Sequence, residues 1–125
     1  MNITGPIKAL IAADSTANGL LAGRVYAGVL QQNSTYPAAV MNLITSTTTN
    51  TKTQAGDLDF INLQVDVYGS TVASASAAAQ AIRNAIQYQT SGDIKHIQFE
   101  RLQDGFSEVP ELFRLISEYS ISYKP

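Results

Sequence analysis

The chain has 125 residues, the length of one domain, and a domain of this size buries roughly two-thirds of the surface that its unfolded chain exposes. Cysteine is absent, which excludes Cys-ligated zinc, thiol nucleophiles and disulfides, and a single histidine, His96, nearly excludes His-rich metal sites. Eight basic residues against ten acidic ones, with no basic cluster, argue against a nucleic-acid-specific site. No apolar run approaches the ~18 residues that cross a bilayer, so we expect no membrane segment and no cleaved signal.

The low content of charge is the most informative feature of the composition. Charged residues make up 14% of the chain, against about 25% in an ordinary soluble domain. Ser, Thr, Asn and Gln are more than twice as numerous as the charged residues. A surface with few charges is easier to desolvate against a partner, which favours a subunit of a larger assembly. A monomeric protein rich in Ser and Thr has the same composition, so both interpretations stay open.

The N-terminal third predicts one helix and a connector. Residues 4–13 read as a helix, since Pro6 suits a first turn and apolar residues follow at spacings of three and four, as Ile7, Leu10 and Ile11. Residues 14–19 contain Asp, Ser, Thr, Asn and Gly, which predict a stop and a turn. Residues 20–36 predict an irregular connector with a short extended piece around Val25.

The middle of the chain predicts a hairpin. Residues 38–47 read as a strand with apolar side chains on both faces. Residues 58–69 are the clearest strand, because apolar and polar side chains alternate along them with period two. Between them, residues 46–57 are low in complexity and contain one apolar residue, Ala55. Such a segment cannot contribute to a core, and it predicts a mobile hairpin tip.

The C-terminal half predicts a helix and a second hairpin. Gly69-Ser70 ends the preceding strand, and a helix follows to about Tyr88, with Ser70 or Thr71 as its cap. Its first half is nearly all Ala and Ser, which lets a helix lie close to a sheet. One apolar stripe runs along it: Val72, Ala75, Ala79, Ile82 and Ile86. Strands are predicted over residues 94–102 and 112–123, with a turn signal at Asp104-Gly105.

The element order predicts the fold class. Helix, strand, strand, helix, strand, strand is an α+β arrangement, a four-stranded, mainly antiparallel sheet with helices packed on one face. No repeat or linker divides the sequence, so we expect residues 1–125 to form a single domain.

A search for catalytic patterns favours a protein without an active site. His96 is the one candidate base; it lies within a predicted strand and lacks a nearby Gly-x-Ser-x-Gly turn. The segment Gly19–Gly23 lacks the Lys-Ser/Thr pair of a phosphate-binding loop. We therefore predict no catalytic residues, no cofactor-binding residues and no metal ligands.

Two pairs of acidic residues are interpreted as solvated surface charge. Asp57 and Asp59 lie at the edge of the low-complexity segment, and Glu108 and Glu111 flank Pro110. Neither pair is embedded in the apolar surroundings that raise a carboxyl pKa. Five of the six tyrosines lie in or beside predicted strands, where tyrosine serves equally as an interface residue or as a half-buried strand residue.

Several strings, taken in order, resemble the tail-completion, or tail-terminator, proteins of long-tailed bacteriophages and prophages. The resemblance covers most of the chain. It starts with the helix at residues 7–14 and continues with a glycine, arginine, β-branched residue and tyrosine at residues 23–26. Its most telling part is the strand at residues 63–69 followed by the Ala-rich helix, and it closes with the aromatic strand at residues 113–123. Ala27 departs from the pattern, because family members often carry proline there.

The resemblance implies a non-enzymatic, structural role. Such proteins form a ring, typically a hexamer, that caps the tail tube, terminates tail polymerisation and provides the head–tail joining surface. The implied partners are further copies of the chain, the major tail-tube protein and a head-completion or connector protein. The implied location is the tail–neck junction of the virion, after assembly in the cytoplasm of the bacterial host.

The Thr-rich segment is the candidate contact with a neighbouring subunit or with the tube, as a segment that becomes ordered on contact. An exposed hairpin without a partner explains its composition equally well. The candidate contact residues are Thr48, Thr49, Asn50, Thr51, Lys52, Thr53 and Gln54.

Two other functions stay open. The first is a different neck component, a head-completion or head–tail connector protein. The second is a small ligand-binding α+β domain or enzyme, which predicts a deep polar cleft around His96, Asp66 or Glu100.

Overall fold

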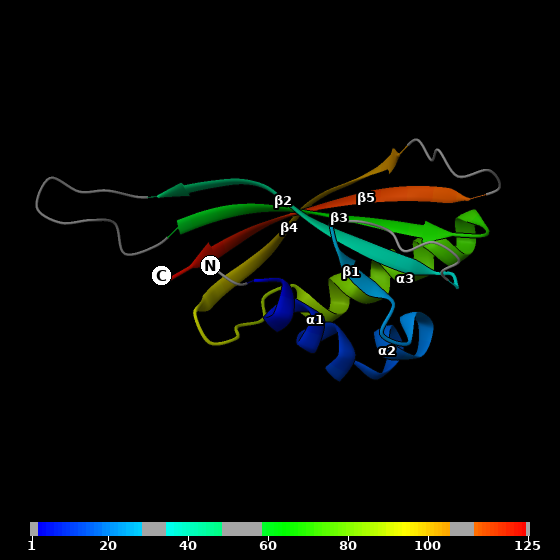
Figure 1. Ribbon diagram of the computed structural model, residues 1–125, viewed down its shortest axis with the longest axis horizontal. Helices are drawn as coiled ribbons and strands as arrows, with labels where there is room; N and C mark the ends of the chain where they lie inside the picture. Colours follow the sequence, from blue (N-terminus) through cyan, green and yellow to red (C-terminus); the bar gives the residue numbers. More distant parts are fainter. Residues whose placement is uncertain (1–2, 29–34, 49–58, 106–111, 125) are drawn as a thin grey trace, which may run out of the picture.

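The computed structural model describes residues 3–28, 35–48, 59–105 and 112–124. In these ranges three helices and five strands form a helix-backed sheet (Figure 1). In chain order the elements are α1 (Thr4–Ala13), α2 (Ser15–Leu21), β1 (Val25–Ala27), β2 (Ala38–Thr48), β3 (Asp59–Gly69), α3 (Val72–Ile86), β4 (Ile94–Gly105) and β5 (Phe113–Tyr123).

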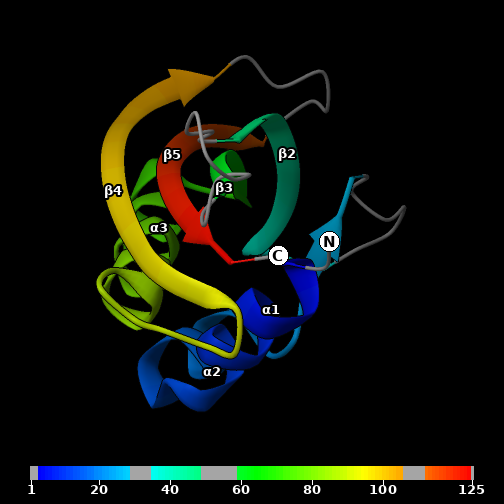
Figure 2. The ribbon, with the colours of Figure 1, turned by 90° about the vertical axis from the view of Figure 1, so that its left-hand side faces the viewer.

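The five strands form one sheet in the order β1-β2-β3-β5-β4. β1 pairs with β2 in parallel, whereas every other neighbouring pair is antiparallel. The three helices all lie on one side of the sheet (Figure 1). Viewed from its end, the sheet curls strongly, with β4 along one side and the short β1 on the other (Figure 2).

The predicted fold class is confirmed as α+β, but the prediction of four strands in a helix-strand-strand-helix-strand-strand order is wrong in detail. The sheet has five strands among the described residues and is mixed, because the extended piece around Val25 becomes β1 and adds a parallel edge. The predicted turn at residues 14–19 is also wrong, since these residues belong mostly to helix α2.

Asp14 explains how two helices replace one helix and a turn. Its extended backbone ends α1, and its side chain accepts a hydrogen bond from the N–H of Ala17 at 2.9 Å, which caps α2. Helix α2 ends at Leu21, and the left-handed backbone of the next residue, Ala22 (φ 47°), returns the chain toward the sheet. The Asn18-Gly19 pair therefore lies inside a helix whose burial of Leu21 outweighs its weak intrinsic propensity.

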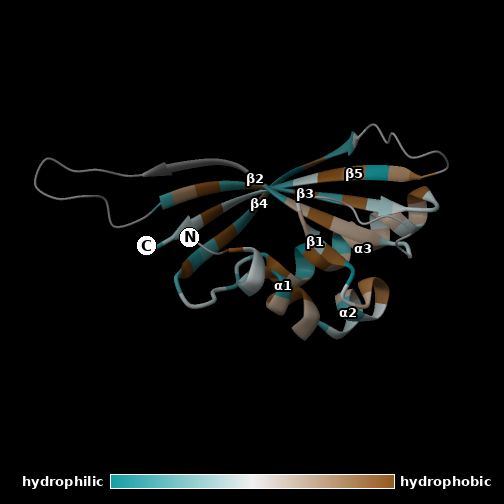
Figure 3. Ribbon diagram, in the orientation of Figure 1, coloured by the Kyte–Doolittle hydropathy of each residue, from teal (hydrophilic) through white to brown (hydrophobic). Residues whose placement is uncertain are grey.

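The core lies between the helices and the sheet. Along β3 the side chains alternate as predicted, with Ile61, Leu63, Val65 and Val67 almost fully buried. The banding of apolar and hydrophilic residues along the strands is visible in Figure 3. Residues from all three helices complete this core, including Ile7, Ile11, Leu21, Ile82 and Ile86.

Helix α3 begins and packs as the sequence predicts, with one exception. The hydroxyl of Thr71 accepts a hydrogen bond from the N–H of Ser74 at 3.0 Å, so Thr71 is the cap. Ala75 and Ala79 of the predicted stripe are buried. Val72 is the exception, because the residue is 57% exposed.

Strand β4 runs to Gly105, beyond the predicted end of the strand at residue 102. The Asp104-Gly105 turn signal is therefore wrong in position, since Asp104 pairs with Leu115 and Gly105 with Arg114. Register shifts lie between Ile94 and His96 and between Phe99 and Arg101. Such bulges bend an edge strand and increase its local twist.

The approach of α3 to β3 leaves no room for a side chain at Gly69. A Cβ atom there would lie 2.7 Å from the backbone nitrogen of Ala75, so the helix would have to move. We expect Gly69→Ala to lower the free energy of unfolding by about 1–3 kcal/mol, measured by urea denaturation. Gly19→Ala is the matched control, because Gly19 lies in α2 with nothing within 4 Å; it should stabilise the protein by about 0.5–1 kcal/mol. Equal effects of the two substitutions would contradict the close packing.

Candidate assembly surface

The face of the sheet that turns away from the helices is almost entirely polar. Residues paired across antiparallel strands point to the same face, so the register identifies its members. We call this surface the polar face. On β3, β5 and β4 it consists of Phe60, Asn62, Gln64, Asp66, Tyr68, Arg114, Ile116, Glu118, Ser120, Ser122, His96, Gln98, Arg101 and Gln103.

One ion pair on the polar face is buried. The guanidinium Nη2 of Arg114 on β5 lies 2.7 Å from Oδ2 of Asp66 on β3, and the Asp66 side chain is only 4% exposed. The amide Nε2 of Gln64 donates to the other carboxylate oxygen of Asp66 at 2.8 Å. Arg114 also lies over the ring of Tyr68, 6.0 Å from its centroid. Asp66, which the sequence placed among possible cleft residues, is therefore engaged in a structural contact.

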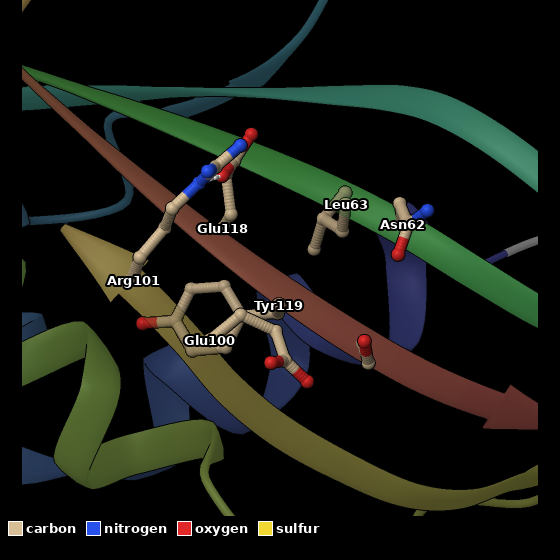
Figure 4. Close-up of a pocket in the computed structure, with 7 residues that line it drawn as sticks. Asn62, Leu63, Glu100, Arg101, Glu118 and Tyr119 are labelled. Carbon is tan, nitrogen blue, oxygen red and sulfur yellow. Dashed lines mark hydrogen bonds and ion pairs between the residues drawn. The ribbon is translucent and has the colours of Figure 1, made fainter. Parts of the chain in front are cut away.

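A second ion pair lines a hollow of about 500 Å³ on this surface (Figure 4). Arg101 of β4 and Glu118 of β5 form the pair, and Figure 4 shows their side chains together, with Glu100 apart from them. The rest of the lining is supplied by Asn62, Leu63, Tyr119 and Ser120. Because Arg101 neutralises Glu118, the net charge of the lining residues is that of the one remaining carboxylate, Glu100.

The candidate catalytic groups do not gather at this hollow. Glu100 lines it, but neither His96 nor Asp66 does. His96 lies opposite Ser122, and its ring contacts that of Tyr88, with 6.0 Å between the centroids. Asp59 is buried at the start of β3, opposite Tyr123, so its interpretation as solvated surface charge is wrong. Asp57, Glu108 and Glu111 lie outside the described residues.

The following two statements hold for residues 3–28, 35–48, 59–105 and 112–124. Within them, no three His, Cys, Asp or Glu side chains are grouped so that they could hold a metal ion. None of the helices described is both long and apolar enough to cross a membrane.

On the helix side of β4 and β5, three side chains stack in series. The guanidinium of Arg83 on α3 lies over the ring of Phe99, 4.0 Å from its centroid. The ring of Phe99 meets that of Tyr119 edge to face, at 5.5 Å. Desolvation by burial raises the pKa of Tyr119 above its ordinary value, and the charge of Arg83 opposes part of that rise. These contacts therefore hold α3 against β4 and β5.

Tyr119 is only 1% exposed, and its hydroxyl finds no hydrogen-bond partner among the described residues. A hydroxyl that loses its water without gaining a partner opposes folding. We expect Tyr119→Phe to raise the free energy of unfolding by about 1 kcal/mol in urea denaturation. Tyr123→Phe, at a half-buried position, is the control and should change it by less. A loss of stability in Tyr119→Phe would show that the hydroxyl has a partner.

Most of the predicted contact residues lie outside the residues that the structure describes. Thr48 ends β2, where its backbone pairs with that of Asp59. Thr49, Asn50, Thr51, Lys52, Thr53 and Gln54 lie outside the described residues. The polar face itself was missed in the sequence, because period-two alternation shows which residues point outward but not that three strands align them in one surface.

Comparisons with known proteins agree with this architecture. Residues 5–124 match the family described as Tail completion protein gp17. No curated protein matches the chain significantly. Among solved structures, a chain of the virion of a native gene transfer agent particle shares the fold, with a TM-score of 0.74 and 17% identity. The match covers 98% of this chain and 95% of the other. Because the family match spans nearly all of the sequence, the chain belongs to the tail completion protein gp17 family and is a structural tail protein.

Proposed function

We propose that the chain forms a ring of six copies that caps the finished tail tube, terminates its polymerisation and offers the joining surface for the head. The observation that carries this proposal is the family match over residues 5–124, together with a fold shared along the whole chain with a component of a virion particle. The charge-poor surface supports it, since both ion pairs on the polar face are internally neutralised. Because the chain carries few charges, a partner that covers this face removes water from few charged groups.

Self-association is the first measurement. Native mass spectrometry of the purified protein is expected to show a closed oligomer with six copies, alone or after addition of the major tail-tube protein. The second measurement is tube length: tubes polymerised in the presence of the protein should be capped at one end and stop growing. A chain that stays monomeric at high concentration with tube protein present would contradict the proposal. Binding to the head connector without any effect on tube growth would favour a different neck component.

We assign the tube or neighbour contact to residues 48–54. The segment is rich in Thr, carries one charge, that of Lys52, and contains no apolar residue that could join a core. Deleting residues 48–54 is therefore expected to leave the cooperative thermal transition in place while binding to tubes falls at least tenfold in a cosedimentation assay. Lys52→Ala, which keeps the length of the segment, is the control for simple loss of charge. If the deletion variant loses its melting transition, the segment belongs to the fold rather than to a contact.

A further inference from the structure

The two edges of the sheet run in opposite directions. β1 is parallel to β2, and β2, β3, β5 and β4 then alternate in direction, so β4 is antiparallel to β1. These edge strands lie on opposite sides of the curled sheet (Figure 2). A second copy, rotated about an axis along the strands, therefore brings its β4 beside β1 in an antiparallel orientation. This geometry is head-to-tail, and repeated rotation of that kind generates a ring.

Part of the β4 edge is already covered within the chain. The N–H of Tyr88 donates to the carbonyl of Ile97 at 2.7 Å, and Tyr88 adopts a left-handed backbone (φ 66°) at this position. A non-glycine residue rarely takes that conformation, and a bulky one does so only where the surroundings enforce it. The bulge between Phe99 and Arg101 follows directly. The stretch of β4 that remains for another strand begins at Leu102.

This remaining stretch lies level with β1 across the sheet. Ala27 is in register with Met41, Met41 with Val65, Val65 with Ser117, and Ser117 with Leu102. The same chain of registers connects Val25, through Ala39, Val67 and Leu115, to Asp104. A rotated copy therefore meets β1 with residues 102–104 without sliding along the strands.

The backbone hydrogen-bonding groups also match. Arg24 O accepts from Ala39 N–H and Gly28 N–H donates to Met41 O, so alternate residues of β1 face β2 and the intervening Val25 and Ala27 face away. On β4 the carbonyl of Ile97 faces away from β5. The backbone groups that hydrogen-bond to β4 belong to alternate residues of β5. The β5 partners of Leu102 and Asp104 lie an even number of residues from the partner of Ile97, so the backbone groups of Leu102 and Asp104 also face away from β5. In this register, the residues of β1 whose backbone groups face outward therefore lie opposite the residues of β4 whose backbone groups face outward.

The side chains at these positions are complementary. Leu102 is 48% exposed on the helix side of the sheet. A groove of about 420 Å³ runs beside β1 on the same side, lined by Thr4, Gly5 and Lys8 of α1, by β1 itself and by Met41. Asp104 lies two residues beyond Leu102 on the same face. In a neighbouring copy, Leu102 would enter this groove and the exposed Asp104 would approach the exposed Lys8.

We propose that subunits join through these two edges: residues 102–104 of one copy add antiparallel to β1 of the next, with Ala27 opposite Leu102 and Val25 opposite Asp104. This inference rests on the proposed ring and names the surface that closes it. The occupant of the groove beside β1 is thus a second copy of this chain. The contact keeps the strands of the described fold in place, and it competes with one internal hydrogen bond, from Val25 N–H to Gly23 O at 2.8 Å.

Disulfide trapping tests the register directly, since the native chain has no cysteine. The double variant Ala27→Cys/Leu102→Cys, under mild oxidation, is expected to give a ladder of linked oligomers on a non-reducing gel that ends at the ring size. Each single variant should stop at a dimer. Ala27→Cys/Gln103→Cys is the register control and should give no ladder, because Gln103 points to the polar face. Equal ladders from both double variants would overturn the assigned register.

A charge exchange provides an independent test without cysteine. Asp104→Lys should raise the dissociation constant between subunits at least about tenfold, because it places a like charge beside Lys8. Adding Lys8→Asp to the same chain should restore association, whereas Lys8→Asp alone should weaken it. If native mass spectrometry shows a wild-type ring that neither test perturbs, the edge contact is wrong and the ring stands. A monomeric wild-type protein overturns both.

Discussion

Replacing Val65 with aspartate is expected to abolish cooperative folding. Val65 is fully buried in the centre of β3, between α3 and the neighbouring strands. A carboxylate there has no partner, and burying an unpaired charge costs several kcal/mol, comparable with the whole stability of about 5–15 kcal/mol of a domain this size. Circular dichroism during heating should show a broad, non-cooperative change in place of a sharp transition.

Val72→Asp is the matched control for this substitution. Val72 is 57% exposed in the first turn of α3, where a negative charge interacts favourably with the helix dipole. We expect its free energy of unfolding to stay within about 0.5 kcal/mol of the wild type. A normal melting transition in Val65→Asp would contradict the placement of the core.

The second large effect is expected at the buried ion pair of the polar face. Asp66→Ala leaves Arg114, whose side chain is 25% exposed, without its carboxylate. Breaking a fully buried pair costs about 3–5 kcal/mol, and because Arg114 partly reaches water we expect about 2–3 kcal/mol here. Urea denaturation measures the loss. The double variant Asp66→Val/Arg114→Leu should regain most of it, since no uncompensated charge then remains.

Glu118→Gln tests the contrasting case on the same face. Arg101, its partner, has a side chain that is 65% exposed, so water screens the pair. We expect a loss of less than 1 kcal/mol. A loss in Glu118→Gln as large as that in Asp66→Ala would show that burial does not separate the two pairs.

Elements with strong local signals were predictable from the sequence. Strand β3 alternates with period two from Ile61 to Tyr68, and α3 carries a capping threonine and an apolar stripe. In both cases local preference and tertiary burial agree along most of the element, with Val72 as the exception in α3. The N-terminal helix was predicted with its observed ends, because Asp14 terminates it by backbone conformation as well as by composition.

Elements decided by distant contacts were not predictable in the same way. Helix α2 contains Asn18 and Gly19, which locally favour a turn, and it exists because Ala17 and Leu21 are buried against the rest of the core. β1 is three residues long and becomes a strand only through pairing with β2. β4 continues past a turn signal because β5 supplies partners for Asp104 and Gly105.

The residues that form the surface contacts were likewise not predictable from the sequence. The pair Asp66–Arg114 joins residues 48 positions apart, and nothing in the local sequence of either residue indicates the other. The predicted contact segment was selected by composition alone, and its role remains a proposal. The edge contact depends on registers across five strands, which only the assembled sheet provides.

The alanines of α3 have a consequence for how relatives of this chain can vary. Ala75, Ala78 and Ala81 lie against their surroundings with almost no exposed surface. A larger residue at any of these sites would push the helix outward from the sheet. At Gly69 the strand and the helix are already too close for even one added carbon atom. Drift during evolution is thus confined to exchanges that keep these volumes small. Distant homologues should be recognisable by the size of the residues at these positions even where their identity has been lost.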